Sequence, residues 1–293
     1  MPEAGDYLFS RVGFSREETP VLSFQQNDSF YDLAPLNHKL TLRFTMTQRF
    51  CIGWGDIATG ERFVCPNANT VEKNYEQCAG CQQRTGFNPA FYHATSVSTQ
   101  QEARNQEPHM LYLAYFGKGT IKVGISHAAR NNARLLEQGA RYALILDIFP
   151  SAHIAREYEA KIAKIAGIAE TIQLRKKISL LEQPLTADDA TSELIATREL
   201  IETELSITFT QNHVQSLDEH FFPKKRPDLG IAHDCSDQHL ISGVTIGMLG
   251  SLLFCSHEEE PVFLPLKKYI GFKVSLSYNQ TALVIPARQT SFF

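Results

Sequence analysis

The sequence predicts an α+β protein with a β-rich N-terminal region, a central β-β-α-β-α module, a helical connector and a β-rich C-terminal region. Three patterns lead to this prediction. Apolar and polar residues alternate near the N-terminus, short apolar runs and helical periodicity are interleaved in the middle, and glycine-punctuated apolar runs return towards the end. We expect these parts to span residues 1–107, 108–178 and 179–293, with the connector and the last strands together in the third part. A chain of 293 residues is long enough for two or three domains that each bury a core.

The N-terminal region has its clearest strand signal at residues 40–46. Apolar residues from Leu40 to Met46 occupy every second position, with polar residues between them, as in a half-buried strand. Residues 96–107 are polar and lack a clear period. They form a linker or exposed loop, or else a surface helix favoured by their Gln, Glu and Ala content.

The central module begins with two short apolar runs on either side of a Gly-Lys-Gly-Thr turn, which predicts a hairpin. A helix follows and ends at Gly139, because glycine is the usual C-terminal cap. A later segment has apolar residues at spacings of three and four, which predicts a second helix. The predicted elements are strands 111–116 and 121–125, a helix at 128–138, a strand at 142–149 and a helix at 151–166.

The remaining third of the chain starts with an acidic helical stretch at 188–205, interpreted as a packing helix or connector. The pattern then becomes β again. The expected strands lie at 244–253, 262–266 and 271–278.

Positive charge is concentrated in the central module. The whole chain has a formal charge of −4, so it is not a uniformly basic nucleic-acid coat protein. Residues 110–177 hold 11 basic and 5 acidic residues, which gives +6 and leaves 17 basic and 27 acidic residues elsewhere. A basic module in an acidic chain indicates a phosphate-binding face. The alternative is a solvated basic surface that arises by chance.

No apolar run approaches the ~18 residues that would span a bilayer, so no membrane partner is expected. The start of the chain lacks the basic and hydrophobic regions of a secretory signal. Six cysteines are too few for a disulfide scaffold in a chain of this length. We therefore expect a cytoplasmic protein whose clustered cysteines bind metal.

Four cysteines near the N-terminus have the spacing Cys-x13-Cys-x12-Cys-x2-Cys: Cys51, Cys65, Cys78 and Cys81. A closed shell of four thiolates normally holds a structural zinc ion, which can stabilise a loop-rich region. The alternative is four unrelated buried cysteines. A redox pair is disfavoured, because Cys78-Ala-Gly-Cys81 is not expected between a strand and a helix. Trp54 is expected to pack over this site, with stacking on a base as the alternative.

Other metal-ligating residues give weaker signals. His93 is an alternative ligand in place of Cys51. Cys235 lies between His233 and His239, a set that lacks a fourth ligand, and Cys255 is expected in the core.

Four features of the module resemble the GIY-YIG nuclease superfamily: Met110-Leu-Tyr112 on the first strand, Lys122-Val-Gly124 on the second, Arg134 on the next helix and Glu159 on a later one. Across the whole chain, the cysteine cluster, the Lys122-Val-Gly-Ile-Ser and Glu137-Gln-Gly-Ala stretches and the glycine-punctuated β tail resemble a bacterial family catalogued as domain of unknown function 2797.

The GIY-YIG resemblance implies catalytic roles. Tyr112 would help to activate a water molecule, Arg134 would stabilise charge on phosphate, and Glu159 would bind Mg²⁺. Lys122 stands where the family has its second tyrosine. It would contact phosphate or mark a module that binds without cutting.

The helix arginine usually follows the motif glycine by about eight residues, but Arg134 follows Gly124 by ten and Arg130 by six. The alternative interpretations are a core tyrosine at 112, a surface arginine at 134 and a solvated acid at 159. The expected nucleic-acid-binding residues are Lys118, Lys122, Arg130 and Arg134.

These features predict a zinc-stabilised nucleic-acid-binding protein with a GIY-YIG-like module, which would hydrolyse a phosphodiester with Mg²⁺ if it is catalytic. One alternative is a group transferase that uses RNA, such as a charged tRNA. Another is a non-catalytic scaffold. The sequence does not choose between RNA and DNA.

Overall fold

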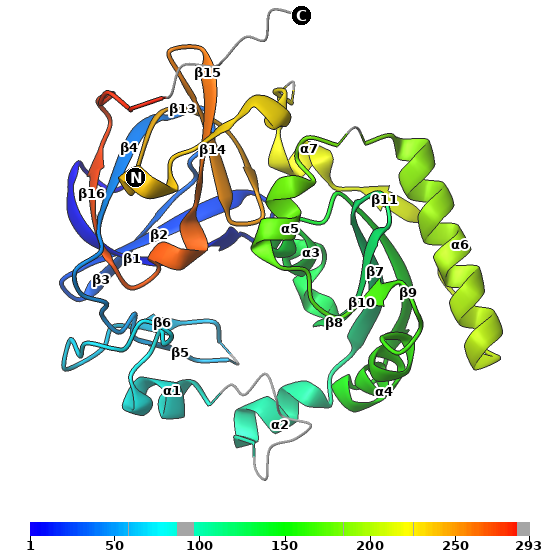
Figure 1. Cartoon of the computed structure of the whole chain (residues 1–293). Coiled ribbons are helices and arrows are strands. Elements are labelled where there is room, and N and C mark those ends of the chain that lie inside the picture. The colour runs from blue at the N-terminus through cyan, green and yellow to red at the C-terminus, as the bar shows by residue number, and fades with distance from the viewer. Residues whose placement is uncertain (58, 87–96, 184, 225, 286–293) are drawn as a thin grey trace, which may run out of the picture.

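Both ends of the chain contribute strands to one nine-stranded sheet. The computed structural model describes residues 1–57, 59–86, 97–183, 185–224 and 226–285. The N-terminal strands are β1 (Gly5–Phe14), β2 (Pro20–Gln26), β3 (Ser29–Leu33) and β4 (Lys39–Thr45). The C-terminal strands are β12 (His233–Asp234), β13 (Leu240–Leu249), β14 (Leu252–His257), β15 (Glu260–Pro265) and β16 (Lys273–Ser277). Their order is β12-β15-β14-β13-β4-β16-β1-β2-β3, so β16 lies between two N-terminal strands (Figure 1).

The alternating pattern of β4 explains its central place in this sheet. Leu42 is fully buried and lies opposite Ile241 of β13 on one side and Leu276 of β16 on the other. Such apolar cross-strand neighbours are the units that stabilise a sheet. The strand predicted at residues 40–46 is confirmed.

A second sheet is built from the middle of the chain. Its strands are β7 (His109–Gly117), β8 (Thr120–His127), β9 (Tyr142–Phe149), β10 (Ile168–Ala169) and β11 (Val214–Ser216), in the order β10-β8-β7-β9-β11. The helices that follow strands of this sheet are α3 (Ala133–Gln138), α4 (Ala152–Ile162), α5 (Leu174–Ser179), α6 (Ala187–Leu205) and α7 (Asp218–Phe221). Short 3₁₀ helices occur at Ala128–Arg130, Leu229–Ile231, Ser236–Gln238 and Leu266–Tyr269.

The central strand β7 is buried on both faces. Its residues Leu111 and Leu113 pack with Ile162 of α4 and Leu194 of α6. The alternate residues, such as Tyr112, belong instead to the large core of the nine-stranded sheet. Because successive strand residues point to opposite faces, β7 joins two cores.

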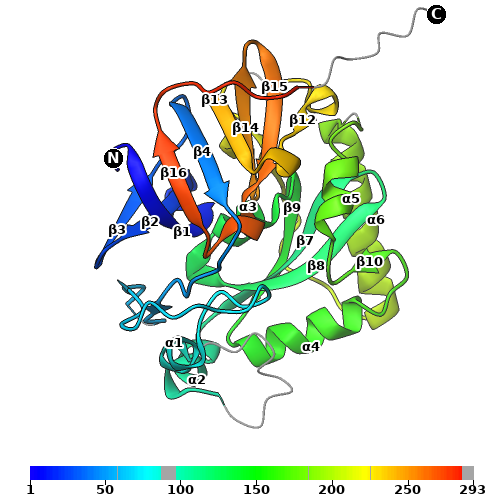
Figure 2. The ribbon, with the colours of Figure 1, turned by 60° about the vertical axis from the view of Figure 1, so that its left-hand side comes forward.

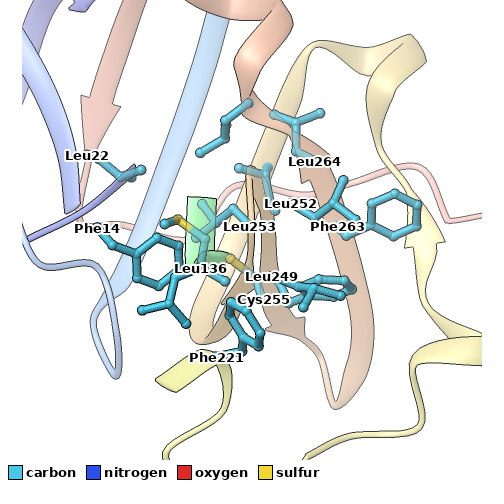
Figure 3. Close-up of a cluster of buried hydrophobic side chains, with 14 of the residues drawn as sticks. Phe14, Leu22, Leu136, Phe221, Leu249, Leu252, Leu253, Cys255, Phe263 and Leu264 are labelled. Atoms are coloured by element: carbon cyan, nitrogen blue, oxygen red, sulfur yellow. The ribbon is translucent and has the colours of Figure 1, made fainter. Parts of the chain in front are cut away.

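Helix α3 connects the two sheets. Its Leu136 is fully buried in the same hydrophobic cluster as Phe14 and Leu22 from the N-terminal strands and Leu253 and Leu264 from the C-terminal strands (Figure 3). The large core therefore unites residues from the whole length of the chain.

The cysteine-bearing segment lies at one end of the molecule, below both sheets in Figures 1 and 2. It contains β5 (Trp54–Gly55), β6 (Arg62–Phe63), α1 (Ala79–Thr85) and α2 (Thr99–Asn105). The residues 96–107, for which a linker or a helix was expected, thus include the helix α2. N-terminal to it, the Ser98 side chain accepts a hydrogen bond from the backbone N–H of Gln101 at 3.1 Å, as an N-cap does.

The mixed α+β class is confirmed, and most predicted elements coincide with observed ones. The helix predicted at 151–166 ends four residues earlier, at Ile162, and two other predicted elements are each divided in two. The helix predicted at 128–138 is two pieces, because Asn131 has a φ of +45° and ends the first piece. The strand predicted at 244–253 is also two strands, β13 and β14, joined by a turn at Gly250, which has a φ of +61°.

Candidate functional site

A pocket of about 520 Å³ lies between the second sheet and the cysteine-bearing segment. Strands β7 and β8, the arginines around α3 and the start of α4 form one wall, and Ile57 and α2 form the other. Among the residues that the structure describes, its charged lining consists of the basic residues Arg104, Lys122, Arg130, Arg134 and Arg156 and the acidic residue Glu159.

Tyr112 lies on β7 and is 1% exposed. Gly124 is directly opposite on β8, and a methyl group there would come within 2.5 Å of the Tyr112 hydroxyl. The hydroxyl accepts a hydrogen bond of 2.7 Å from Gln138 Nε2. Burial raises the pKa of Tyr112, so the phenol stays neutral at physiological pH.

Glu159 is buried on α4 and forms an ion pair with Arg156, three residues earlier. Arg156 also lies 3.5 Å from Glu170. Lys122 is half-buried on β8, and its Nζ donates to the Val123 carbonyl at 3.0 Å. Burial lowers the pKa of Lys122, and the nearby Glu159 carboxylate opposes that shift.

Three arginines share one carboxylate at the edge of this pocket. Glu137 lies 2.7 Å from Arg130, 3.8 Å from Arg134 and 3.8 Å from Arg11. One negative charge cannot neutralise three positive ones, so this cluster keeps an excess of positive charge.

The structure brings together most of the residues predicted from the sequence. Tyr112, Lys122, Arg130, Arg134 and Glu159 all line the same pocket. The break in the predicted helix at Asn131 places Arg130 before it and Arg134 after it, and both reach the pocket. Lys118 does not, because it lies in the turn between β7 and β8, at the other end of the hairpin from His109 and His127.

Several residues of the pocket were not identified from the sequence. His109 and His127 face each other across β7 and β8, with ring centres 5.2 Å apart, and His127 pairs with Glu107. Counting the register back from the predicted turn would have placed Ala128 opposite His109, because a bulge between Tyr115 and Gly117 shifts the pairing by one residue. Arg104 and Asn105 on α2 gave no local signal, because they reach the pocket only through the tertiary fold.

The four N-terminal cysteines converge on one point. The sulfur atoms of Cys51, Cys65, Cys78 and Cys81 all lie within 4.8 Å of one another, so they could hold a metal ion. A set of four sulfur ligands is compatible with zinc. Trp54 packs against this cluster, as expected, and its ring stacks on Phe63 with centres 4.1 Å apart.

The surroundings of the cysteines differ. A hydrogen bond from the Asn69 side chain is the main reason why the pKa of Cys78 falls to about 6. Burial instead raises the pKa of Cys51 and of Cys81. The backbone N–H of Cys78 donates to Cys51 Sγ at 3.2 Å, which favours the thiolate form of Cys51 that a metal requires.

The other expectations about cysteines have mixed outcomes. The Cys78–Cys81 pair does not lie between a strand and a helix, since α1 begins directly after Cys78 and contains Cys81, and the preceding strand β6 ends at Phe63. Cys235 and Cys255 are both buried in the large core. Among the described residues, the four N-terminal cysteines are the one group of three or more potential ligands that meets the distances of a metal site. His93 lies outside the described residues.

Comparison with known proteins gives one match. A family model described as a protein of unknown function (DUF2797) matches residues 37–274. No curated protein and no solved structure matches. In the part of the chain that the structure describes, no helix combines the length and the apolar character that crossing a membrane requires.

Proposed function

Because the chain belongs to the DUF2797 family, which carries no assigned activity, we propose a function from its own residues: it is a zinc-stabilised protein that binds nucleic acid through the basic pocket. The observation that carries this proposal is the convergence of five basic side chains from four separate segments on one pocket of about 520 Å³. Nucleic-acid affinity comes largely from such contacts with phosphate.

The charges of the pocket favour an anion as ligand. Arg130 and Arg134 share Glu137 with Arg11, so a phosphate would relieve their mutual repulsion. Lys122 has a lowered pKa because burial removes it from water, and an anion beside it would favour its charged form again.

The cysteine cluster supports a structural zinc ion. Its four thiolates would form a closed shell with no open position for a substrate. The ion would fix the segment that carries α2, which forms one wall of the pocket.

Hydrolysis of a phosphodiester is the second candidate. It is favoured by the gathering of Tyr112, Arg134 and Glu159, the residues that resemble GIY-YIG nucleases, around a single pocket. Glu159 is already paired with Arg156, so this ion pair would have to open before the carboxylate could bind Mg²⁺. The charges that line the pocket therefore favour nucleic-acid binding without cleavage over Mg²⁺-dependent hydrolysis.

The test of binding compares two lysines of the same hairpin. Lys122 lines the pocket and Lys118 does not. Binding is measured by fluorescence anisotropy with labelled oligonucleotides. We expect Lys122→Met to weaken binding about tenfold and to reduce the slope of log affinity against log salt concentration by about one. Lys118→Met should have little effect. Equal losses in both variants, or no binding by the wild type at low salt, would refute the proposal.

The test of hydrolysis uses the same oligonucleotides, RNA and DNA, with Mg²⁺ and denaturing gels. Cleavage by the wild type that is lost in Glu159→Gln would establish a nuclease. Intact strands throughout would leave the protein as a binding protein.

A further inference from the structure

A second pocket of about 380 Å³ adjoins the first one at Arg134. Arg134 lines both pockets, so its side chain forms the boundary between them. The second pocket has a mixed lining, in which Arg11, Arg62 and Lys267 are basic, Glu76 and Glu137 are acidic, and Phe30 and Ile270 are apolar. Both volumes fall in the range of ~300–1,000 Å³ that holds small organic ligands.

The cysteine-bearing segment covers both pockets. Ile57 contributes to the first pocket, and Trp54 and Gly55 contribute to the second. The same segment lies below both sheets in Figures 1 and 2. A ligand that occupies both pockets would therefore run between this segment and the body of the protein.

The first pocket also has an unsatisfied donor. Asn105 on α2 lines it and is 4% exposed, and its Nδ2 has no hydrogen-bond partner within the described part of the chain. A buried donor without a partner destabilises the folded protein and needs an explanation. An acceptor atom on a ligand would satisfy it.

We propose that the nucleic acid is bound as a single strand, with one unpaired nucleotide in the first pocket, its neighbour in the second and the phosphate between them at Arg134. This inference rests on the proposed function and specifies its ligand. A base within a duplex is paired and stacked, and it enters a concave pocket only after it is extruded. An unpaired base meets no such barrier, and its acceptor atoms can accept a hydrogen bond from Asn105.

The first test compares ligands and needs no variant. A labelled single strand of twelve nucleotides, as DNA and as RNA, is bound by the full-length zinc-loaded protein and then displaced with unlabelled competitors. An unlabelled single strand should compete at least tenfold better than a hairpin duplex with the same number of phosphates. A duplex that competes equally well would overturn the inference and leave phosphate binding intact.

The second test replaces the unsatisfied donor. Asn105→Leu keeps the branching and the number of side-chain heavy atoms and removes the orphan N–H, so the free protein should be at least as stable as the wild type. The same variant should bind the single strand at least fivefold more weakly. Opposite effects on stability and affinity are the signature of a ligand-binding donor.

A matched control comes from Gln25 on β2. Its Oε1 is also buried without a hydrogen-bond partner among the described residues, but it lines a different pocket, beside Cys51. Gln25→Leu should leave single-strand affinity unchanged. Equal affinities for wild type and Asn105→Leu would contradict the role of Asn105 in the site. The comparison of Lys122→Met with Lys118→Met tests the proposed function alone, so the two failures can be told apart.

Discussion

At the scale of single residues, Gly124 decides where the Tyr112 hydroxyl can lie. The two residues are opposite each other on β7 and β8, and any Cβ at 124 would overlap the phenol ring. The sequence pattern marked both positions, but it did not show that the glycine makes room for the tyrosine.

We expect Gly124→Ala to destabilise the protein by about 1–3 kcal/mol, because Tyr112 must move and lose its bond to Gln138. Denaturant unfolding measures this change. The control is Gly80→Ala on α1, where a new methyl group would meet nothing within 4 Å and helix propensity should improve slightly. Equal stabilities of the two variants would contradict the steric argument.

Lys177 gives a prediction about pH. Burial, together with the nearby Lys122, lowers the pKa of Lys177 to about 8, while Nζ donates to the Gln138 carbonyl at 2.6 Å. An unfolded lysine titrates near ~10.4. Between these two values the unfolded chain binds more protons than the folded one, so this residue makes stability rise with pH from about 8 to about 10.4.

The measurement is the free energy of unfolding of wild type and Lys177→Met across that range. The difference, wild type minus variant, should increase as the pH rises from 8. A constant difference would show that Lys177 has an ordinary pKa in the folded protein.

At the scale of elements, the small sheet β5–β6 packs against the cysteine cluster through Trp54. Trp54 of β5 stacks on Phe63 of β6, and Gly53 lies so close that a Cβ there would be 2.0 Å from the Phe63 carbonyl oxygen. The four cysteines, the neighbouring helix α1 and this sheet form a region with little apolar core of its own.

If these cysteines hold the proposed zinc ion, its removal by a chelator should unfold this region and move the emission of Trp54, the only tryptophan, to longer wavelength. Cys81→Ser should have the same effect. Cys255→Ala serves as control, since Cys255 lies in the large core and the variant should keep one zinc ion per chain. Unchanged emission in protein shown to be free of metal would contradict a structural role for the ion.

At the scale of the whole molecule, the second sheet cannot be separated from the first without exposing apolar surface. The face of β7 that holds Tyr112, together with Leu135 and Leu136 of α3, is buried against the nine-stranded sheet. The sequence boundaries at residues 107 and 178 mark changes of composition, and the core runs across both.

An excised fragment of residues 108–217 should accordingly lack cooperative folding and bind a hydrophobic dye. Full-length protein should unfold in one transition. Heteronuclear NMR of the fragment checks this expectation. Dispersed signals and a free energy of unfolding equal to that of the full-length protein would contradict it.

The sequence alone predicted the features that depend on local patterns. The alternation in β4, the hairpin of β7 and β8, the cap at Gly139 and the extent of α6 follow from residue periodicity and backbone preference. The grouping of four cysteines follows from chemistry, because thiolates that are few and clustered in sequence point to a shared ion.

Tertiary structure alone decided which segments meet. Residues Leu42 and Leu276 are neighbours although 233 residues separate them, and no local pattern encodes that pairing. Tertiary packing also places α2 against the pocket and brings Arg134 to the lining of two pockets. It likewise sets the surroundings in which Glu159 pairs with Arg156. Periodicity specifies which face of an element is apolar, whereas the partner of that face is chosen by packing and edge pairing over the whole chain.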